Sequence, residues 1–218
     1  MDKAKKILDK YGASLREEVW QLLALGFEVM KKGVDTAHTE KHVLNILDNL
    51  ERFLKSKEIE VEKIDFEVLM VAIFWHDVWK SSRRPATPWL IIKNQCFEGW
   101  GSARILQKEN LDEMFDKGRQ KKIIWAIRNH QAVKTPFGDS LESRILQDMD
   151  RLERWDSGRA DEFFPNFKNF FVIKNKRSLD WMERWYRKWY MPRRDNESKY
   201  HFEWSKVEYK RRREEWEK

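Results

Sequence analysis

The chain has 218 residues, which is enough for one domain with a hydrophobic core of ordinary size. Its single cysteine, Cys96, excludes an intramolecular disulfide bond, and no segment approaches the roughly 20 apolar residues of a membrane span. We therefore expect a cytoplasmic protein without a membrane partner, and the formal net charge of +7 favours anionic partners such as nucleotides or nucleic acid.

Apolar residues recur at helical spacing along most of the chain, and few runs alternate as strands do, so we expect an all-α fold. The first helix that concerns function is predicted for residues 36–55 and the second for residues 66–76, with Asp65 as the N-cap. The inner face of the first helix consists of Val43, Ile46, Leu47, Leu50, Phe53 and Leu54.

The polar stretch SSRRPATPW, at residues 81–89, contains two prolines and is predicted to be a loop. We expect further helices at residues 101–108, 120–131 and 140–155, and two basic helices at 178–190 and 197–217, joined across MPRRDN. Residues 1–160 are predicted to form the functional domain, and residues 161–218 a basic, Trp-rich helical extension that packs on it.

The segment AIFWHDVWK, residues 72–80, carries His76 and Asp77 where an apolar helix is expected to end. A buried His-Asp pair costs free energy unless a partner or a metal ion satisfies it. Without further partners, the pair would be read as a hydrogen bond at a helix end.

A second histidine-bearing segment, HTEKH, places His38 and His42 on one face of a helix. The spacing is that of the HExxH zinc helix, but Glu40 stands third in the run, and the metalloprotease general base stands second. This excludes a metalloprotease and leaves both histidines as candidates for the neighbourhood of the His-Asp pair.

Two later segments complete the pattern: AIRNHQ, with His130 near a helix end, and ILQDMDRL, with Asp148 and Asp150. In this order, the four segments resemble the HD-domain metal-dependent phosphohydrolase superfamily over about residues 37–155. The resemblance implies an HD-domain-like helical bundle that hydrolyses a nucleotide or similar phosphate ester with a metal-activated water. The metal ligands that it implies are His42, His76, Asp77 and Asp150.

This ligand set suits one divalent ion, of Mn, Fe, Co, Ni, Mg or Zn. Relatives with two metals carry an additional histidine between the His-Asp pair and the I-x-x-H-like segment; here Glu98 is the only substitute, and we expect one metal. Asp148 is expected to orient a metal ligand without contacting the metal itself, or else to cap a helix or pair with a basic neighbour.

The resemblance also implies roles in catalysis and substrate binding. Asp77, Lys80 and His130 are the candidate catalytic residues, because a lysine in the HDxxK position can neutralise a phosphate oxygen and a histidine can carry a proton. Lys80, Arg83 and Arg84 are the candidate substrate-binding residues. Solvated side chains are the alternative for all three cations.

The basic extension contains Trp181, Trp185 and Trp189, four residues apart, with Tyr186 and Tyr190 beside them. A stripe at helical spacing usually marks a buried face, so we expect these side chains to pack on the core; stacking on nucleic-acid bases is the alternative. The KRRR run at residues 210–213 is expected to be a solvated face. The alternative function is a non-catalytic module that binds nucleic acid or nucleotides. Oligomeric state is not predicted.

Overall fold

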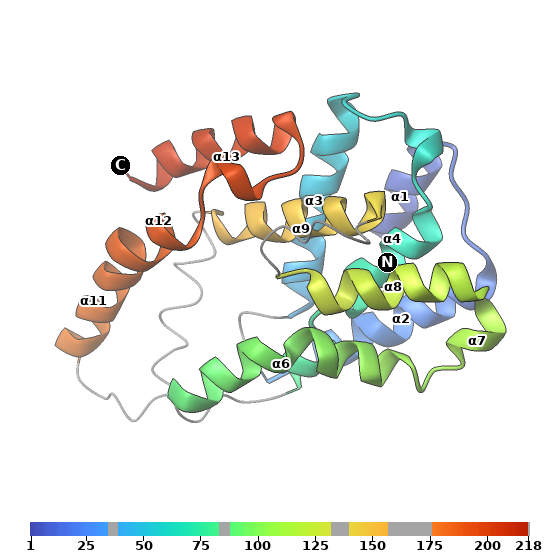
Figure 1. Ribbon diagram of the computed structural model, residues 1–218, viewed down its shortest axis with the longest axis horizontal. Coiled ribbons are helices and arrows are strands. Elements are labelled where there is room, and N and C mark those ends of the chain that lie inside the picture. Colours follow the sequence, from blue (N-terminus) through green and yellow to red (C-terminus); the bar gives the residue numbers. More distant parts are fainter. Residues whose placement is uncertain (35–38, 83–87, 132–139, 157–175, 218) are drawn as a thin grey trace.

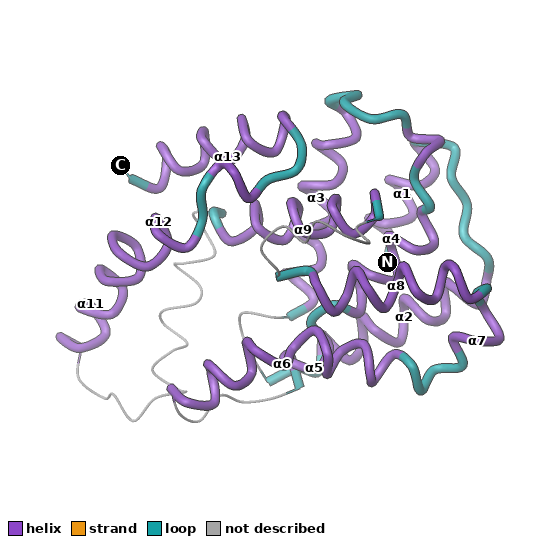
Figure 2. Tube along the Cα trace, in the orientation of Figure 1, coloured by secondary structure: helices purple, strands orange, loops and turns teal. Residues whose placement is uncertain are grey.

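The computed structural model describes residues 1–34, 39–82, 88–131, 140–156 and 176–217. Within these ranges the chain consists of helices and loops without a strand, as Figure 2 shows, so the predicted all-α class is confirmed. No helix in these ranges combines the length and the apolar character needed to cross a membrane.

The helices follow one another along the chain as Figure 1 labels them. In order, the elements are α1 (Asp2–Lys10), α2 (Glu17–Lys31), α3 (Glu40–Lys55), η1 (Val61–Lys63), α4 (Phe66–Trp75), α5 (Val78–Ser81), α6 (Pro88–Leu106), α7 (Leu111–Met114), α8 (Lys117–Asn129), α9 (Leu141–Arg154), α11 (Lys176–Trp185), η2 (Tyr186–Tyr190), α12 (Met191–Arg194), η3 (Glu197–Lys199) and α13 (Glu203–Trp216).

Helix α4 is the centre of the bundle, and every one of its residues is buried. Its sequence, FEVLMVAIFW, is apolar on nearly all sides, so it needs partners all round, and α2, α8 and α9 pack against it. Asp65 caps the helix as predicted, because its carboxylate accepts a hydrogen bond from the amide of Val68 at 3.3 Å. The helix ends at Trp75, which places His76 and Asp77 at the junction with α5.

The helices that carry the other candidate residues begin at polar caps. Helix α9 starts after Ser140, whose hydroxyl accepts from the amide of Ser143, and the prediction of residues 140–155 is confirmed. Helix α3 starts after Thr39, so the predicted start at residue 36 is too early. Helix α8 begins and ends slightly earlier than predicted and leaves His130 as its C-terminal cap residue.

Helix α6 begins at Pro88, inside the predicted loop, and is therefore much longer than the helix predicted at residues 101–108. It passes through Gly99 and Gly101, which serve close packing and do not break the helix. A Cβ atom at Gly99 would lie 2.5 Å from the carbonyl oxygen of Arg128 in α8, and one at Gly101 would lie 2.2 Å from the indole of Trp79. Only glycine therefore permits α6 to approach both neighbours.

The C-terminal helix α13 packs on α9 and α3 and is part of the bundle (Figure 1). Arg212 is buried there and donates hydrogen bonds to the carbonyl of Leu152 at 2.7 Å and to Oδ1 of Asn49 at 2.6 Å. The prediction of a solvated KRRR face is thus wrong for Arg212, although Lys210 and Arg211 are exposed and Arg213 is half-buried.

The helix that starts at Lys176 does not end where the sequence predicts. It continues through the π-helical turn η2 into α12 and ends at Arg194, so Pro192, in the predicted connection MPRRDN, lies within helical backbone directly after the π-helical turn. The predicted burial of its tryptophan stripe is wrong, because Trp181, Trp185 and Trp189 are all exposed.

Candidate metal centre

Four elements bring the candidate residues to one place in the bundle. His42 lies in the first turn of α3, His76 and Asp77 lie between α4 and α5, and Asp150 lies in α9. Helix α4 packs against both α3 and α9, so the three segments meet although more than 100 residues separate the first from the last. All four side chains are buried.

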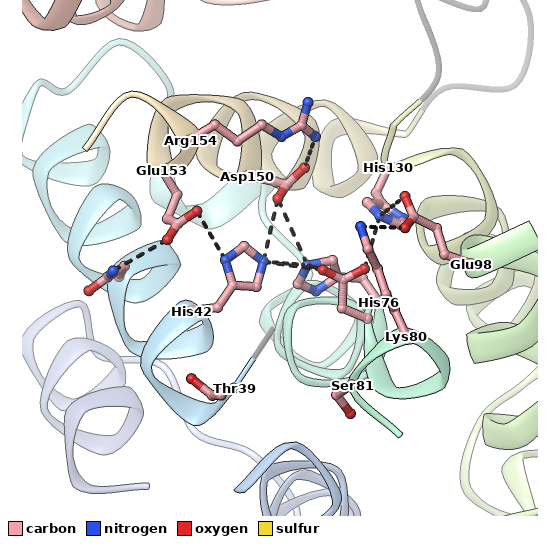
Figure 3. A network of polar contacts seen from close by, with 12 residues as sticks. Thr39, His42, His76, Lys80, Ser81, Glu98, His130, Asp150, Glu153 and Arg154 are labelled. Carbon is pink, nitrogen blue, oxygen red and sulfur yellow. Dashed lines mark hydrogen bonds and ion pairs between the residues drawn. The ribbon is translucent and has the colours of Figure 1, made fainter. Parts of the chain in front are cut away.

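The two imidazoles and two carboxylates lie within a few ångströms of one another, as Figure 3 shows for the labelled side chains. Nε2 of His42 is 3.0 Å from Nε2 of His76, and Oδ2 of Asp77 is 3.4 Å from each of these nitrogens. Oδ1 of Asp150 lies 3.5 Å from Nε2 of His42 and 4.0 Å from Nε2 of His76. The four predicted ligands therefore converge on a common point.

The Nδ1 atom of each ring faces an oxygen atom, and for His76 this contact fixes the tautomer. Nδ1 of His76 lies 2.8 Å from the carbonyl oxygen of Ile73, and since a carbonyl can only accept, Nδ1 carries the proton. Nδ1 of His42 lies 3.1 Å from Oε2 of Glu153, whose Oε1 accepts from the side-chain amide of Asn45. When neutral, the His76 ring therefore presents the lone pair of its Nε2 to Nε2 of His42.

The Nε2 lone pair of His76 and two carboxylates converge here beside His42, and this concentration of negative charge favours a cation among them. A donor set of two imidazole nitrogens and two carboxylates is one that divalent transition metals bind. His42, His76 and Asp150 could hold such an ion, and so could an adjoining group made of His76, Asp77 and His130.

Arg154 keeps Asp150 charged inside the protein. Its guanidinium donates a short hydrogen bond to Oδ2 of Asp150 from one turn further along α9 (Figure 3). Burial alone would raise the pKa of Asp150, but Arg154 and the surrounding imidazoles outweigh burial and hold this pKa well below its usual range. Oδ1 thus remains an ionised donor that faces the histidines.

Lys80, Glu98 and His130 form the other half of the cluster. Nζ of Lys80 lies 2.6 Å from Oε2 of Glu98, while Nε2 of His130 lies 3.7 Å from Oε1 of Glu98 and 3.4 Å from Oδ1 of Asp77. Nδ1 of His130 is 2.7 Å from the carbonyl of Ile127, so its Nε2 also points at carboxylates. Burial lowers the pKa of His130, but Asp77 and Glu98 outweigh burial and raise it above the usual value.

The side chain of Asp148 points away from the histidine cluster and binds the backbone of another segment. Both of its carboxylate oxygens accept backbone hydrogen bonds from the segment before α13, from His201 at 3.0 and 2.9 Å and from Phe202 at 3.1 Å. Two residues of a helix that are two apart face nearly opposite directions, so only one of Asp148 and Asp150 can face the histidines. The expected role in orienting a metal ligand is therefore wrong, and burial raises the pKa of Asp148 to about 6.

Three predicted neighbours of the site, His38, Arg83 and Arg84, lie outside the described residues. Conversely, the sequence prediction missed Glu153 and Arg154. The signal for Arg154 was present, because an arginine four residues after an aspartate on a helix can pair with it. Glu153 lies one turn after Met149 on the same helix and could be assigned to His42 only once α3 and α9 were known to pack together.

The described chain also has an open pocket of about 570 Å³ away from this cluster, beside η1 and the start of α4. Its charged groups satisfy one another: Arg16 lies 2.8 Å from Glu67, and Arg119 lies 2.8 Å from Asp65 and 3.2 Å from Glu67. The histidine cluster, in contrast, brings together side chains that could hold a metal ion, and we take it as the candidate functional site.

Comparison of the chain with models of protein families, with curated proteins and with solved structures gave no match.

Proposed function

We propose that this protein is a metal-dependent phosphohydrolase of the HD type, which hydrolyses a nucleotide or nucleotide-like phosphate ester. The single observation that carries the proposal is the convergence of His42, His76, Asp77 and Asp150 in a buried cluster, with the Nε2 atoms of the two histidines 3.0 Å apart. The helical bundle and the order of the four residues along the chain support it.

The donor set fits one divalent ion, because two imidazole nitrogens and two carboxylates already face one another without it. Mn, Fe, Co, Ni, Mg and Zn are the candidates. When bound, such an ion polarises a phosphoryl oxygen and lowers the pKa of a water, which supplies a nucleophile near neutral pH.

The protein's own residues prepare the site for that chemistry. The carbonyl of Ile73 holds the His76 ring with Nε2 unprotonated, and Glu153 lies against Nδ1 of His42. Arg154 holds Asp150 ionised. The buried setting keeps the number of competing waters low and strengthens these interactions.

Lys80 and His130 are placed to handle the substrate. The ammonium group of Lys80 has three donors, so it can keep its contact with Glu98 and still donate to a phosphate oxygen. His130 faces Asp77 with Nε2 and can hold a proton there for the leaving group. Arg83 and Arg84 directly follow α5 in sequence and would add bidentate phosphate contacts.

We further propose that Lys80 keeps the site to one metal. The group of His76, Asp77 and His130 has the donors for a second ion, and Glu98 adds another carboxylate beside it. The ammonium of Lys80 lies against Glu98 and supplies the positive charge that this half of the cluster requires. A second divalent ion would have to displace a paired ammonium group.

The test compares metal content and hydrolysis in the same preparations. Purified protein is stripped with a chelator, reloaded with Mn²⁺ or Co²⁺, analysed for bound metal and assayed for phosphate release from a panel of nucleotides. The His76→Ala and Asp77→Ala variants should lose bound metal and metal-stimulated release while keeping the helical circular dichroism. Asp112→Ala, at an exposed aspartate of α7, is the control. Metal-stimulated activity that persists in both site variants would refute the proposal.

A further inference from the structure

The exposed tryptophan stripe on α11 and η2 has no role in the proposed hydrolysis. Trp181, Trp185 and Trp189 are 61%, 44% and 57% exposed. They are four residues apart, so successive indoles lie about 6 Å apart along the helix axis. Three neighbouring indoles exposed to water are costly for a soluble protein, and such apolar patches usually mark a binding surface.

The same helix has a large excess of positive over negative charge. Residues 176–194 contain seven Lys or Arg and two Asp or Glu, a net charge of +5 out of +7 for the whole chain. Some of this charge has a partner, since Arg187 pairs with Glu183 at 2.9 Å and the guanidinium of Arg193 lies 3.5 Å from the ring centroid of Trp189. The excess nevertheless makes this segment strongly attractive to an anion.

Three of these cations run alongside the tryptophans on the helix surface. Arg177, Arg184 and Lys188 are exposed, and each stands three or four residues from a tryptophan of the stripe, hence next to it on the helix surface. We call these three cations and the three tryptophans the Trp–Arg face.

The base of the helix is anchored to the bundle, which fixes the direction of the Trp–Arg face. Met191 is fully buried, and the indole of Trp216 in α13 donates to the carbonyl of Arg187 at 3.3 Å. The guanidinium of Arg187 also lies 5.1 Å from the ring centroid of Trp216. In Figure 1, α11 lies at the edge of the molecule, next to α12 and away from α1 and α7.

We propose that the Trp–Arg face binds single-stranded nucleic acid, with bases stacked on the indoles and phosphates contacted by the neighbouring cations. Aromatic platforms beside a line of cations are the means by which proteins bind single strands without sequence preference. Indoles about 6 Å apart require a strand whose bases are unstacked, because stacked bases of a duplex are about 3.4 Å apart and closed to side chains.

Binding to an anionic membrane surface requires a different arrangement of apolar and charged side chains. A helix that lies in the membrane interface separates its apolar and charged residues onto opposite faces. On the Trp–Arg face they share the exposed side, so an indole inserted among acyl chains would draw its neighbouring cations in with it. The arrangement thus favours the nucleic acid.

The experiment measures fluorescence anisotropy of a labelled oligo-dT of about 15 nucleotides, a length within the range that one binding fold covers. The variants Trp181→Ala, Trp185→Ala and Trp189→Ala should each weaken binding about fivefold or more, while Trp185→Phe should retain most of the affinity because it keeps an aromatic face. All of these side chains are exposed, so thermal unfolding should be unchanged.

The charge contribution is tested with two variants of equal net charge. The plot of log affinity against log salt concentration has a negative slope, and Arg184→Gln/Lys188→Gln should make it shallower by about 1.4. This is the value for two lost phosphate contacts on a single strand. Lys210→Gln/Arg211→Gln, at exposed cations of α13, should leave the slope nearly unchanged. Equal effects of the two double variants, or affinity for duplex DNA that matches that for the single strand, would overturn the proposal. So would binding to phosphatidylserine vesicles with no binding to the oligonucleotide.

Discussion

Nε2 of His42 faces Nε2 of His76 at 3.0 Å, and the carbonyl of Ile73 fixes the His76 ring so that its Nε2 lacks a proton when the ring is neutral. A metal ion can bind among these nitrogens and the neighbouring carboxylates in the folded state and has no such site in the unfolded chain. We therefore expect Mn²⁺ or Co²⁺, at about 100 times its dissociation constant, to raise the free energy of unfolding by about 2.7 kcal/mol. Thermal unfolding with and without metal measures this.

The control for this effect is His42→Ala, which removes one nitrogen from the cluster. Its unfolding temperature should not respond to the metal. A stabilisation by metal that is the same in this variant would mean that the ion binds elsewhere on the protein.

Metal binding should weaken in acid through the histidines and not through Asp150. The pKa of His130 is raised, so in the metal-free protein this ring takes up a proton on mild acidification and places positive charge beside Asp77. The pKa of Asp150 is held well below its usual range, so Asp150 stays ionised while this occurs. Metal affinity should therefore fall as the pH falls through the histidine range and should show no separate carboxylate step.

Arg154→Gln tests the second half of this prediction. Without the guanidinium, burial raises the pKa of Asp150, and metal affinity should then be lost at higher pH than in the parent protein. Arg144→Gln changes an exposed arginine of the same helix and is the matched control. Titration calorimetry across pH reads out both, and identical profiles for the two variants would contradict the role assigned to Arg154.

Lys80→Met should convert the site from one metal to two. The substitution removes the ammonium from Glu98 and leaves an uncompensated buried carboxylate next to Asp77 and His130. The metal-free variant should lose about 3 kcal/mol of stability, the usual cost of breaking a buried ion pair, and a second divalent ion should restore it. Elemental analysis should give about twice the metal content of the parent.

The partner variant Lys80→Met/Glu98→Gln removes both charges of the pair. It should bind one metal, and its metal-free form should be more stable than that of Lys80→Met. If Lys80→Met still binds a single ion while the parent also binds one, the proposed blocking role of Lys80 fails but the metal centre stands.

The sequence predicted the features of this protein that have a local cause. The apolar run before His76 and the serine cap at Ser140 are visible in short windows, and they placed α4 and α9 correctly. The order and spacing of four residues along the chain led to the expectation that they lie close together. The distances between His42, His76, Asp77 and Asp150 agree with this expectation.

Features with a distant cause were not predictable in this way. Gly99 and Gly101 look like helix breaks until the close approach of α8 and Trp79 is known. The exposure of the tryptophan stripe also depends on which elements cover it, and periodicity alone only indicates that a stripe exists. The pairing of Arg212 with Asn49 joins residues 163 positions apart, so its neighbours in sequence give no sign that it is buried.

Arg212→Ala should be far more destabilising than the same change at Arg211, although the two residues are adjacent. Arg212 is buried and bonds to the carbonyl of Leu152, to Asn49 and to Glu208, so its loss leaves several buried acceptors unpaired and should cost about 3 kcal/mol or more. Arg211 contacts Glu208 and Glu215 at the surface, where such pairs contribute less than about 1 kcal/mol. Urea unfolding of both variants measures the difference, and equal losses would show that α13 is not held to α3 and α9 by this arginine.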